Sequence, residues 1–82
     1  MLLFARAREA AGTATVEVDL SQLRSPTLGA LLDHARSSYG EDFAAVLASA
    51  RVWVNGDDPT DGDATVLQDG DEVAVLPPVS GG

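Results

Sequence analysis

The sequence predicts a single α+β domain in which a mixed sheet packs on one main helix, with a shorter second helix beside it. Three observations support this: strand-like segments lie near both ends of the chain, helical periodicity fills its middle, and 45% of the 82 residues are hydrophobic. A chain of this length buries roughly 60–65% of its unfolded surface, enough for one core. We therefore expect residues 1–76 to form one domain and residues 77–82 a flexible C-terminal tail.

The first two segments have the character of strands. Residues 1–6 are apolar and end at a polar stretch, as a buried strand does. Residues 15–20, T-V-E-V-D-L, alternate between apolar and polar side chains, which is the period of a half-buried strand. We expect these two segments to form a hairpin with a wide loop over residues 7–13.

Two helices are expected in the middle of the chain. Ser25 or Thr27 should be the N-cap of the first, because its side-chain oxygen can accept a hydrogen bond from a free backbone N–H. The apolar residues of this helix recur at helical spacing, at Leu28, Leu31, Leu32 and Ala35. Gly29 costs up to about 1 kcal/mol relative to Ala, and a close approach of helix to sheet would explain it. After Gly40 the same spacing returns at Phe43, Val46, Leu47 and Ala50, within a second helix over residues 41–50.

Strand signals return in the last third of the chain. R-V-W-V at residues 51–54 stops at Asn55-Gly56, a dipeptide suited to positive φ. E-V-A-V-L at residues 72–76 is the last strand, and pairing should end at Pro77 because proline has no N–H to donate. The order β-β-α-α-β-β, with a tail after the final strand, is that of a mixed sheet gripping one main helix, the β-grasp arrangement.

Charge and missing residue types exclude several functions. Thirteen acidic residues against five arginines give a net charge of −8, so no basic stripe can meet nucleic acid or an anionic membrane. A partner with a basic surface is favoured instead. The chain has no Cys, no Lys and one His, His34, which we expect to be solvated. We therefore expect no thiolate or His-based nucleophile, no metal site and no cofactor bound by this chain.

Several other features of the sequence are expected to have no catalytic or metal-binding role. The aspartates of residues 57–65 lack the spacing of a calcium loop and are expected to be solvated. Arg8 and Glu9 are expected to form a surface ion pair, while Trp53 suits either the core or an interface. No apolar run approaches the roughly 20 residues of a membrane span, and the N-terminus lacks the regions of a signal peptide. We expect a cytoplasmic protein.

The last two residues, Gly81 and Gly82, have two explanations. Terminal residues are poorly ordered in most domains, so a Gly-Gly end can be a frayed terminus. Alternatively, the terminal carboxylate is the working group, and the glycines keep its approach free of side chains. Because the chain offers no other reactive group of the usual kinds, the second explanation gains weight.

Four motifs resemble the family of molybdopterin synthase small subunits, which are ubiquitin-like sulfur carriers. They are F-A-R-A-R-E near the start, P-T-L at the first helix, V-N-G in the middle, and D-G-D-E-V-A-V-L-P-P-V-S-G-G at the end. The resemblance covers the whole chain and is most specific in the last fourteen residues. It implies a ubiquitin-like β-grasp fold and a non-catalytic sulfur-donor subunit, with the active-site residues on a large subunit.

The resemblance also implies the chemistry of the tail. An activating enzyme would use ATP to convert the Gly82 carboxylate to an acyl-adenylate, and a persulfide sulfur would then yield a Gly82 thiocarboxylate. The sulfur would pass to precursor Z, the cyclic pyranopterin monophosphate, during molybdenum cofactor biosynthesis. Gly81 would share in the site. The implied assembly contains two small and two large subunits.

A docking surface is expected beside the tail. Alternation places Val73 and Val75 on one side of the last strand and Leu76 on the other, and Phe4 on the same face as Leu2. Since the first and last strands pack on the large subunit in the family that this chain resembles, we expect partner contacts at Phe4, Leu76, Pro77, Pro78 and Val79.

Three alternatives remain open on the sequence. A sulfur carrier for thiamine thiazole or cysteine biosynthesis would use the same terminal chemistry. A ubiquitin-like protein modifier would be attached through Gly82 to lysines of target proteins. A non-catalytic interaction module would have an idle tail.

Overall fold

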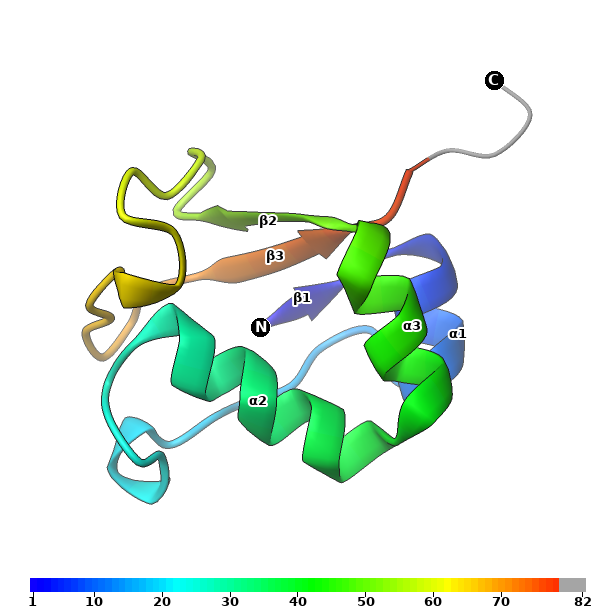
Figure 1. The fold of residues 1–82 in the computed structure, drawn as a ribbon, viewed down its shortest axis with the longest axis horizontal. Helices are drawn as coiled ribbons and strands as arrows, with labels where there is room; N and C mark the ends of the chain where they lie inside the picture. Colours follow the sequence, from blue (N-terminus) through cyan, green and yellow to red (C-terminus); the bar gives the residue numbers. More distant parts are fainter. Residues whose placement is uncertain (79–82) are drawn as a thin grey trace.

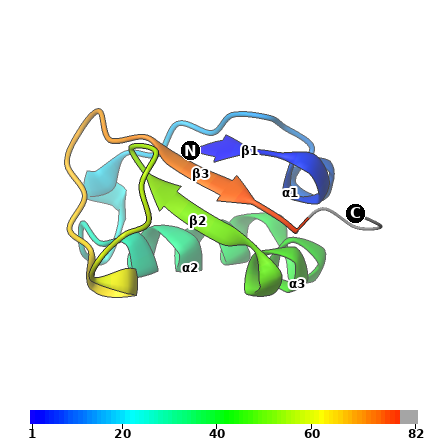
Figure 2. The ribbon, with the colours of Figure 1, turned by 90° about the horizontal axis from the view of Figure 1, so that it is seen from above.

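The computed structural model describes residues 1–78, which form a mixed sheet with three helices in an α+β arrangement (Figure 1). The elements are β1 (Leu2–Leu3), α1 (Ala5–Ala11), α2 (Leu28–Tyr39), α3 (Glu41–Ser49), β2 (Arg51–Val54) and β3 (Val73–Leu76), with short 3₁₀ turns η1 (Leu20–Gln22) and η2 (Gly62–Ala64). Helices α2 and α3 lie on one side of the sheet (Figure 2). No helix within residues 1–78 is long and apolar enough to cross a membrane.

The sheet has the strand order β1-β3-β2. The last strand lies in the centre, parallel to β1 and antiparallel to β2. Its pairing ends at Leu76, directly before the two prolines, as expected. Val73 and Val75 are buried while Ala74 and Leu76 are half-buried, which confirms the predicted facing of this strand.

Residues 5–11 form helix α1, whereas the end of a strand (residues 5–6) and part of a loop (residues 7–13) were expected there. The segment A-R-A-R-E-A-A consists of good helix formers, and Ala7 is fully buried against the core. The start of α1 lacks the usual signal, because Phe4 provides no side-chain cap and Ala5 has a φ of 50°. Gly12 ends the helix in the left-handed region, with its N–H donating to the Arg8 carbonyl.

Residues 15–20 do not form the predicted strand. The hairpin is reduced to one antiparallel bridge between Leu2 and Thr15. The 3₁₀ turn η1 begins at Leu20, directly after Asp19. The Asp19 carboxylate caps this turn by accepting hydrogen bonds from the backbone N–H and the hydroxyl of Ser21, at 2.9 and 2.7 Å. The alternation still predicted the facing correctly: Val16, Val18 and Leu20 pack against the core, while Glu17 and Asp19 are exposed.

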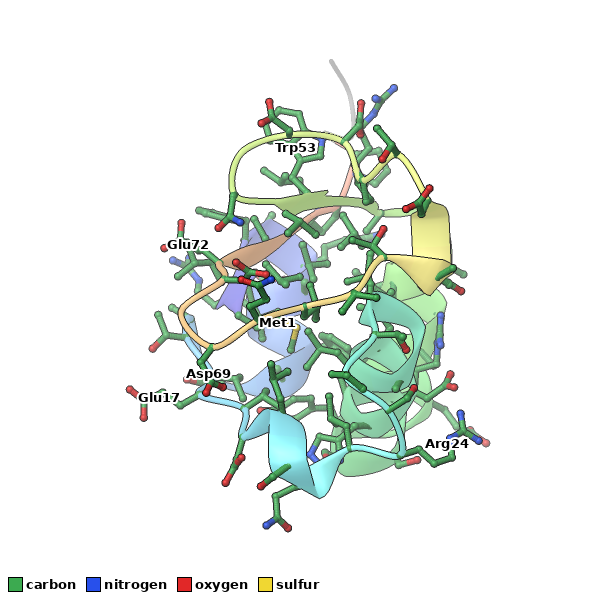
Figure 3. The ribbon with its side chains drawn as sticks, turned by 90° about the vertical axis from the view of Figure 1, so that its left-hand side faces the viewer. Met1, Glu17, Arg24, Trp53, Asp69 and Glu72 are labelled. Atoms are coloured by element: carbon green, nitrogen blue, oxygen red, sulfur yellow. The ribbon has the colours of Figure 1, made fainter. Side chains whose placement is uncertain are left out.

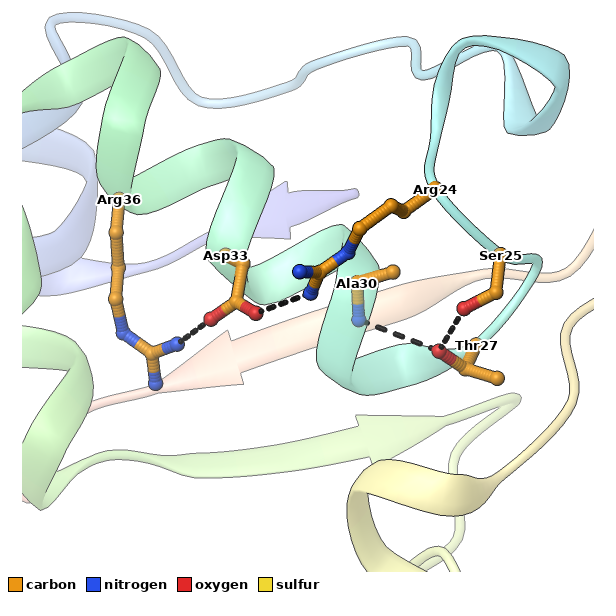
Figure 4. Close-up of polar contacts among 6 residues, drawn as sticks. All are labelled: Arg24, Ser25, Thr27, Ala30, Asp33 and Arg36. Carbon is orange, nitrogen blue, oxygen red and sulfur yellow. Dashed lines mark hydrogen bonds and ion pairs between the residues drawn. The ribbon is translucent and has the colours of Figure 1, made fainter.

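Helix α2 begins at the cap provided by Thr27, not Ser25. The Ala30 N–H donates to Thr27 Oγ1 at 3.3 Å, and the Ser25 hydroxyl contacts the same oxygen (Figure 4). The predicted stripe is buried, at Leu28, Leu31, Leu32 and Ala35. A Cβ at Gly29 would lie 3.0 Å from Asp63 Cβ. The close approach predicted for this glycine is therefore to η2 and not to the sheet.

Helix α3 follows Gly40, whose φ is 88°. Phe43 and Leu47 are buried in the core, and Val46 packs against it from a half-buried position. The rings of Tyr39 and Phe43 pack with centroids 5.2 Å apart. These contacts join the two helices into one layer over the sheet.

The expected charged loop is exposed at Asp57, Asp58, Asp61 and Asp63. Within residues 1–78, no group of His, Cys, Asp or Glu is placed to hold a metal ion. His34 is exposed on α2, as predicted. Arg8 and Glu9 are both exposed, and neither takes part in the two ion pairs formed by residues 1–78, so the predicted pair between them is absent.

Candidate functional site

The chain leaves the sheet after Leu76, and its next two residues line a cleft at the base of the tail. Pro77 is buried and Pro78 is exposed. Together they line a cleft of about 230 Å³ with Arg6 of α1 and with Ala45, Val46 and Ser49 of α3. Helices α1 and α3 thus position the last described residues of the chain.

One face of the sheet is not covered by α2 and α3 (Figure 2). The strand register places Leu2, Ala74 and Trp53 in one row across it. Leu76 lies in the next row, opposite Arg51, and Phe4 adjoins it because the Phe4 N–H donates to the Val75 carbonyl at 3.3 Å. We call Leu2, Phe4, Trp53, Ala74 and Leu76 the open face.

The open face is apolar and partly accessible. Phe4 is 44% exposed, and Trp53 and Leu76 are half-buried. The neighbouring positions Leu3 and Val75 point to the opposite, helix-covered side, where they are 2% and 0% exposed. The expectation that Phe4 and Leu76 share an outward face is therefore confirmed.

Trp53 is the residue of this face that the sequence did not place. A four-residue strand with apolar side chains on both faces leaves two positions possible for it, and the pairing with Ala74 decides between them. Its indole Nε1 is buried and makes no hydrogen bond within residues 1–78. A buried N–H without a partner costs about 1–3 kcal/mol of folding free energy.

Charge differs between the two ends of the central strand. Three of the five arginines lie near the end where the chain leaves the sheet: Arg6 and Arg8 on α1, and Arg51, which pairs with Leu76. Four carboxylates line a pocket that contains Val73, at the beginning of the same strand. The tail therefore leaves from the less acidic end of an acidic protein.

Four of the seven predicted site residues lie within the part of the chain that the structure describes. Phe4, Leu76, Pro77 and Pro78 lie together at one end of the sheet and its adjoining cleft. Val79, Gly81 and Gly82 lie outside the described residues.

The small mixed sheet, with its last strand in the centre and a layer of helices on one side, has the architecture of a ubiquitin-like domain. The model of the ThiS family matches residues 1–82, so the chain belongs to the ThiS family. The family expected from the sequence, that of ubiquitin-like sulfur carriers, is thereby confirmed.

Individual relatives support the same assignment. A molybdopterin synthase sulfur carrier subunit of Drosophila sechellia is 36% identical over 87 residues, which cover all of this chain and 88% of that protein. The crystal structure of SAMP1 from Haloferax volcanii superposes with a TM-score of 0.76 at 30% identity, over 99% of this chain and 94% of that one. A crystal structure of H. volcanii small archaeal modifier protein 1 gives 0.66 at 31% identity, over 95% and 93%.

Proposed function

We propose that this chain is the sulfur-carrying small subunit of a molybdopterin synthase and that Gly82 carries the sulfur as a thiocarboxylate. The observation that carries the proposal is the full-length match to a molybdopterin synthase sulfur carrier subunit. The central strand supports it, because β3 leads directly into the sequence P-P-V-S-G-G. In this assignment the chain is a sulfur donor, and the catalytic residues belong to the large subunit.

The terminal carboxylate requires activation before it can accept sulfur. Its pKa is about 3.3–3.7 in model compounds, so it is anionic at neutral pH and a poor electrophile. An activating enzyme joins it to AMP from ATP, with release of pyrophosphate. A protein persulfide then displaces AMP, and a thiol cleaves the resulting acyl disulfide to leave the thiocarboxylate. Glycine suits these steps because no Cβ obstructs the carbonyl carbon.

The product is the nucleophile that the synthase requires. A thiocarboxylate sulfur forms a C–S bond to precursor Z, the cyclic pyranopterin monophosphate, and the oxygen that it replaces leaves that carbon as water. Water then hydrolyses the resulting thioester, which leaves the sulfur on the pterin and returns the carboxylate of Gly82. The chain itself needs no bound cofactor, since the activating enzyme uses the ATP. These steps belong in the cytoplasm, where we propose that the protein acts.

The open face is proposed as the docking surface for the large subunit. Its central residues are apolar, and Phe4 is 44% exposed. Leu76 connects this surface to Pro77 and Pro78, so binding there would direct Val79 and the terminal glycines toward the partner. Two small subunits on a central pair of large subunits would give the expected heterotetramer.

The decisive experiment is intact-mass analysis of the protein incubated with activating enzyme, ATP and a sulfur donor. We expect one sulfur to replace one oxygen, with the change confined to the C-terminal peptide. Omitting ATP is the negative control. A variant with one extra residue after Gly82 should fold normally and remain unmodified. If the complete mixture leaves only the carboxylate, the sulfur-carrier proposal fails.

A second candidate function is that of a protein modifier attached through Gly82. The observation that favours it is the similarity to small archaeal modifier protein 1. Because this chain has no Lys, it could not extend chains on its own lysine side chains, so each target would carry single units. A blot of cell extract would show discrete conjugates that disappear when Gly82 is deleted.

A carrier for thiazole or cysteine synthesis would give the same mass change. The large partner that co-purifies with the protein distinguishes these pathways from molybdopterin synthesis. An idle tail would be shown by normal function after deletion of Gly81 and Gly82.

A further inference from the structure

A second pocket lies at the end of the sheet where β3 begins. It has a volume of about 500 Å³ and is lined mainly by two segments, residues 15–18 and residues 67–73. Its floor is apolar, because Leu31, Leu67 and Val73 of the core contribute to it. Val16, Val18 and Leu20 extend this apolar lining as half-buried side chains.

The rim of this pocket is acidic. Four carboxylates line it, those of Glu17, Asp69, Asp71 and Glu72. Glu17, Asp69 and Glu72 project from neighbouring segments on one side of the molecule (Figure 3). The Asp71 carboxylate is already engaged, since it accepts hydrogen bonds from Gln68 N at 2.8 Å and Asn55 Nδ2 at 3.1 Å.

The pocket has too little positive charge to balance its four carboxylates. The lining residues include no Arg. The Met1 ammonium is present, but it donates to the Val16 carbonyl at 2.6 Å, and burial lowers its pKa more strongly than Glu72 and Glu17 raise it. The two ion pairs within residues 1–78 join Asp33 to Arg24 and Arg36 (Figure 4), and none of these three residues lines the pocket.

We propose that this acidic pocket binds a basic, partly apolar segment of a partner protein through its Lys or Arg side chains. Such side chains have an apolar stem and a cationic head, so the stem can lie on the floor while the head meets the rim. The volume is in the range of about 300–1,000 Å³ that ligand sites occupy. It exceeds what one small cation would need.

The spacing of the carboxylates favours an extended cation over a metal ion. No group of three or more ligating side chains within residues 1–78 is placed to share one ion. Several guanidinium or ammonium groups along a peptide can instead meet carboxylates that are spread around a rim. The net charge of −8 would also attract such a segment at long range.

The pocket and the docking surface proposed above share Leu2, but the rest of each lies toward an opposite end of β3. Val73 lines the pocket, whereas Leu76, at the other end of the same strand, adjoins Pro77 and the tail. A basic partner that contacts the acidic rim can therefore bind here while Phe4, Leu76 and the tail are engaged elsewhere. The proposal does not depend on what the tail carries.

The test uses the full chain and a fluorescein-labelled peptide of alternating Arg and Leu, with binding measured by polarisation. The variant Glu17→Gln/Asp69→Asn/Glu72→Gln neutralises three carboxylates of the rim. Asp57→Asn/Asp58→Asn/Asp61→Asn is the matched control, since it raises the net charge from −8 by the same amount in the exposed loop. We expect the rim variant to bind roughly tenfold more weakly, because each exposed ion pair contributes a factor of about 1.4 to 5.

Two further measurements locate the site. Amide shifts on titration with the peptide should concentrate at residues 15–18 and 67–73. Val18→Thr, which places a hydroxyl in the apolar lining at nearly the same volume, should also weaken binding. The proposal is overturned if both triple variants weaken binding equally, if the shifts map to the open face, or if a Gln/Leu peptide binds equally well. Binding of spermidine as tight as that of the peptide would assign the pocket to a small polyamine and overturn it too.

Discussion

Asn55 and Asp71 join two turns that lie far apart in the chain. Asn55 Nδ2 donates to Asp71 Oδ1, and Asn55 Oδ1 accepts from the Glu72 backbone N–H at 2.9 Å. These residues belong to V-N-G and D-G-D-E, two of the motifs that identified the family. Their role in this fold is structural, because they hold the ends of β2 and β3 in register.

Acid should weaken the fold partly through Asp71. Hydrogen bonds from Gln68 N, and less strongly from Asn55, lower the pKa of this carboxyl, and the bonds from Ser21 act in the same direction on Asp19. A lowered folded-state pKa stabilises the protein above the unfolded pKa, and this contribution is lost as pH falls through the folded pKa. Asp71→Asn should therefore lower stability at pH 7 and flatten its decline below about pH 4.

Urea unfolding at a series of pH values measures this effect. Asp58→Asn serves as the control, since Asp58 is exposed and its side chain makes no hydrogen bond within residues 1–78. If Asp71→Asn and the parent decline with the same slope, the hydrogen bonds of Asp71 do not contribute to the acid sensitivity.

Gly29 is required by its neighbour and not by its backbone conformation. A Cβ at this position would lie 3.0 Å from Asp63 Cβ and 3.2 Å from the Asp63 carbonyl oxygen. Gly29→Ala should improve helix propensity by up to about 1 kcal/mol, but overpacking costs about 1–3 kcal/mol. We expect a net loss of about 1 kcal/mol in urea unfolding. Ser38→Ala, at an exposed position of α2, is the control and should be neutral or stabilising. If Gly29→Ala also stabilises the protein, η2 can move away from the added methyl group at little cost, and the prediction is wrong.

For the secondary-structure elements, the hydrophobic pattern predicted which side chains face the core more reliably than it predicted which backbone groups pair in a sheet. The alternation of residues 15–20 correctly separated Val16 and Val18 from exposed Glu17, yet no ladder forms there. A period of two reports which side chains point inward, whereas a strand also needs a partner along its length. Helix α1 was missed for the converse reason: its propensity is high, but its start has no capping side chain.

The open face should behave as a docking element. Leu76→Asp or Phe4→Asp should weaken binding of the large subunit by about 2–4 kcal/mol, the range of interface hot spots. Val66→Asp is the matched control, because Val66 is apolar and 66% exposed but lies outside the open face. Trp53, the only tryptophan of the chain, lies on this face and provides a fluorescence signal for binding.

Circular dichroism must remain native for this comparison. An unfolded Leu76→Asp protein would show that Leu76 supports the core, and Phe4→Asp, at a more exposed position, would then carry the test. Equal binding by all three variants and the parent would exclude the open face as the docking surface.

For the whole molecule, the sequence pointed to the tail as the candidate reactive end but did not predict the acidic pocket. The tail is continuous in the sequence, and its last residues carry a recognisable motif. The acidic pocket is assembled from residues 1–2, residues 15–18, residues 67–73, Leu20 and Leu31, which only the fold brings together. Trp53 was unplaced for the same reason, since the register with β3 determines which face it occupies.

The body and the tail should perform separable tasks in this molecule. Two glycines bury almost no apolar area, while ordering their backbone costs roughly 1–2 kcal/mol per residue. The open face, in contrast, offers Phe4, Trp53 and Leu76 as apolar contacts. Deleting Gly81 and Gly82 should therefore preserve most of the affinity for the large subunit and abolish sulfur transfer.

This prediction is checked by titrating the truncated and full-length proteins against the large subunit, with Trp53 fluorescence as the signal, and then assaying formation of the pterin dithiolene with each. Replacing both glycines by alanine is the companion variant, because it keeps the length of the tail and adds only two Cβ atoms. We expect that variant to bind normally and to be activated slowly, since the added methyl groups crowd the carbonyl carbon. Sulfur delivery by the truncated protein would exclude the terminal mechanism, whereas loss of its binding would make the tail itself the principal anchor.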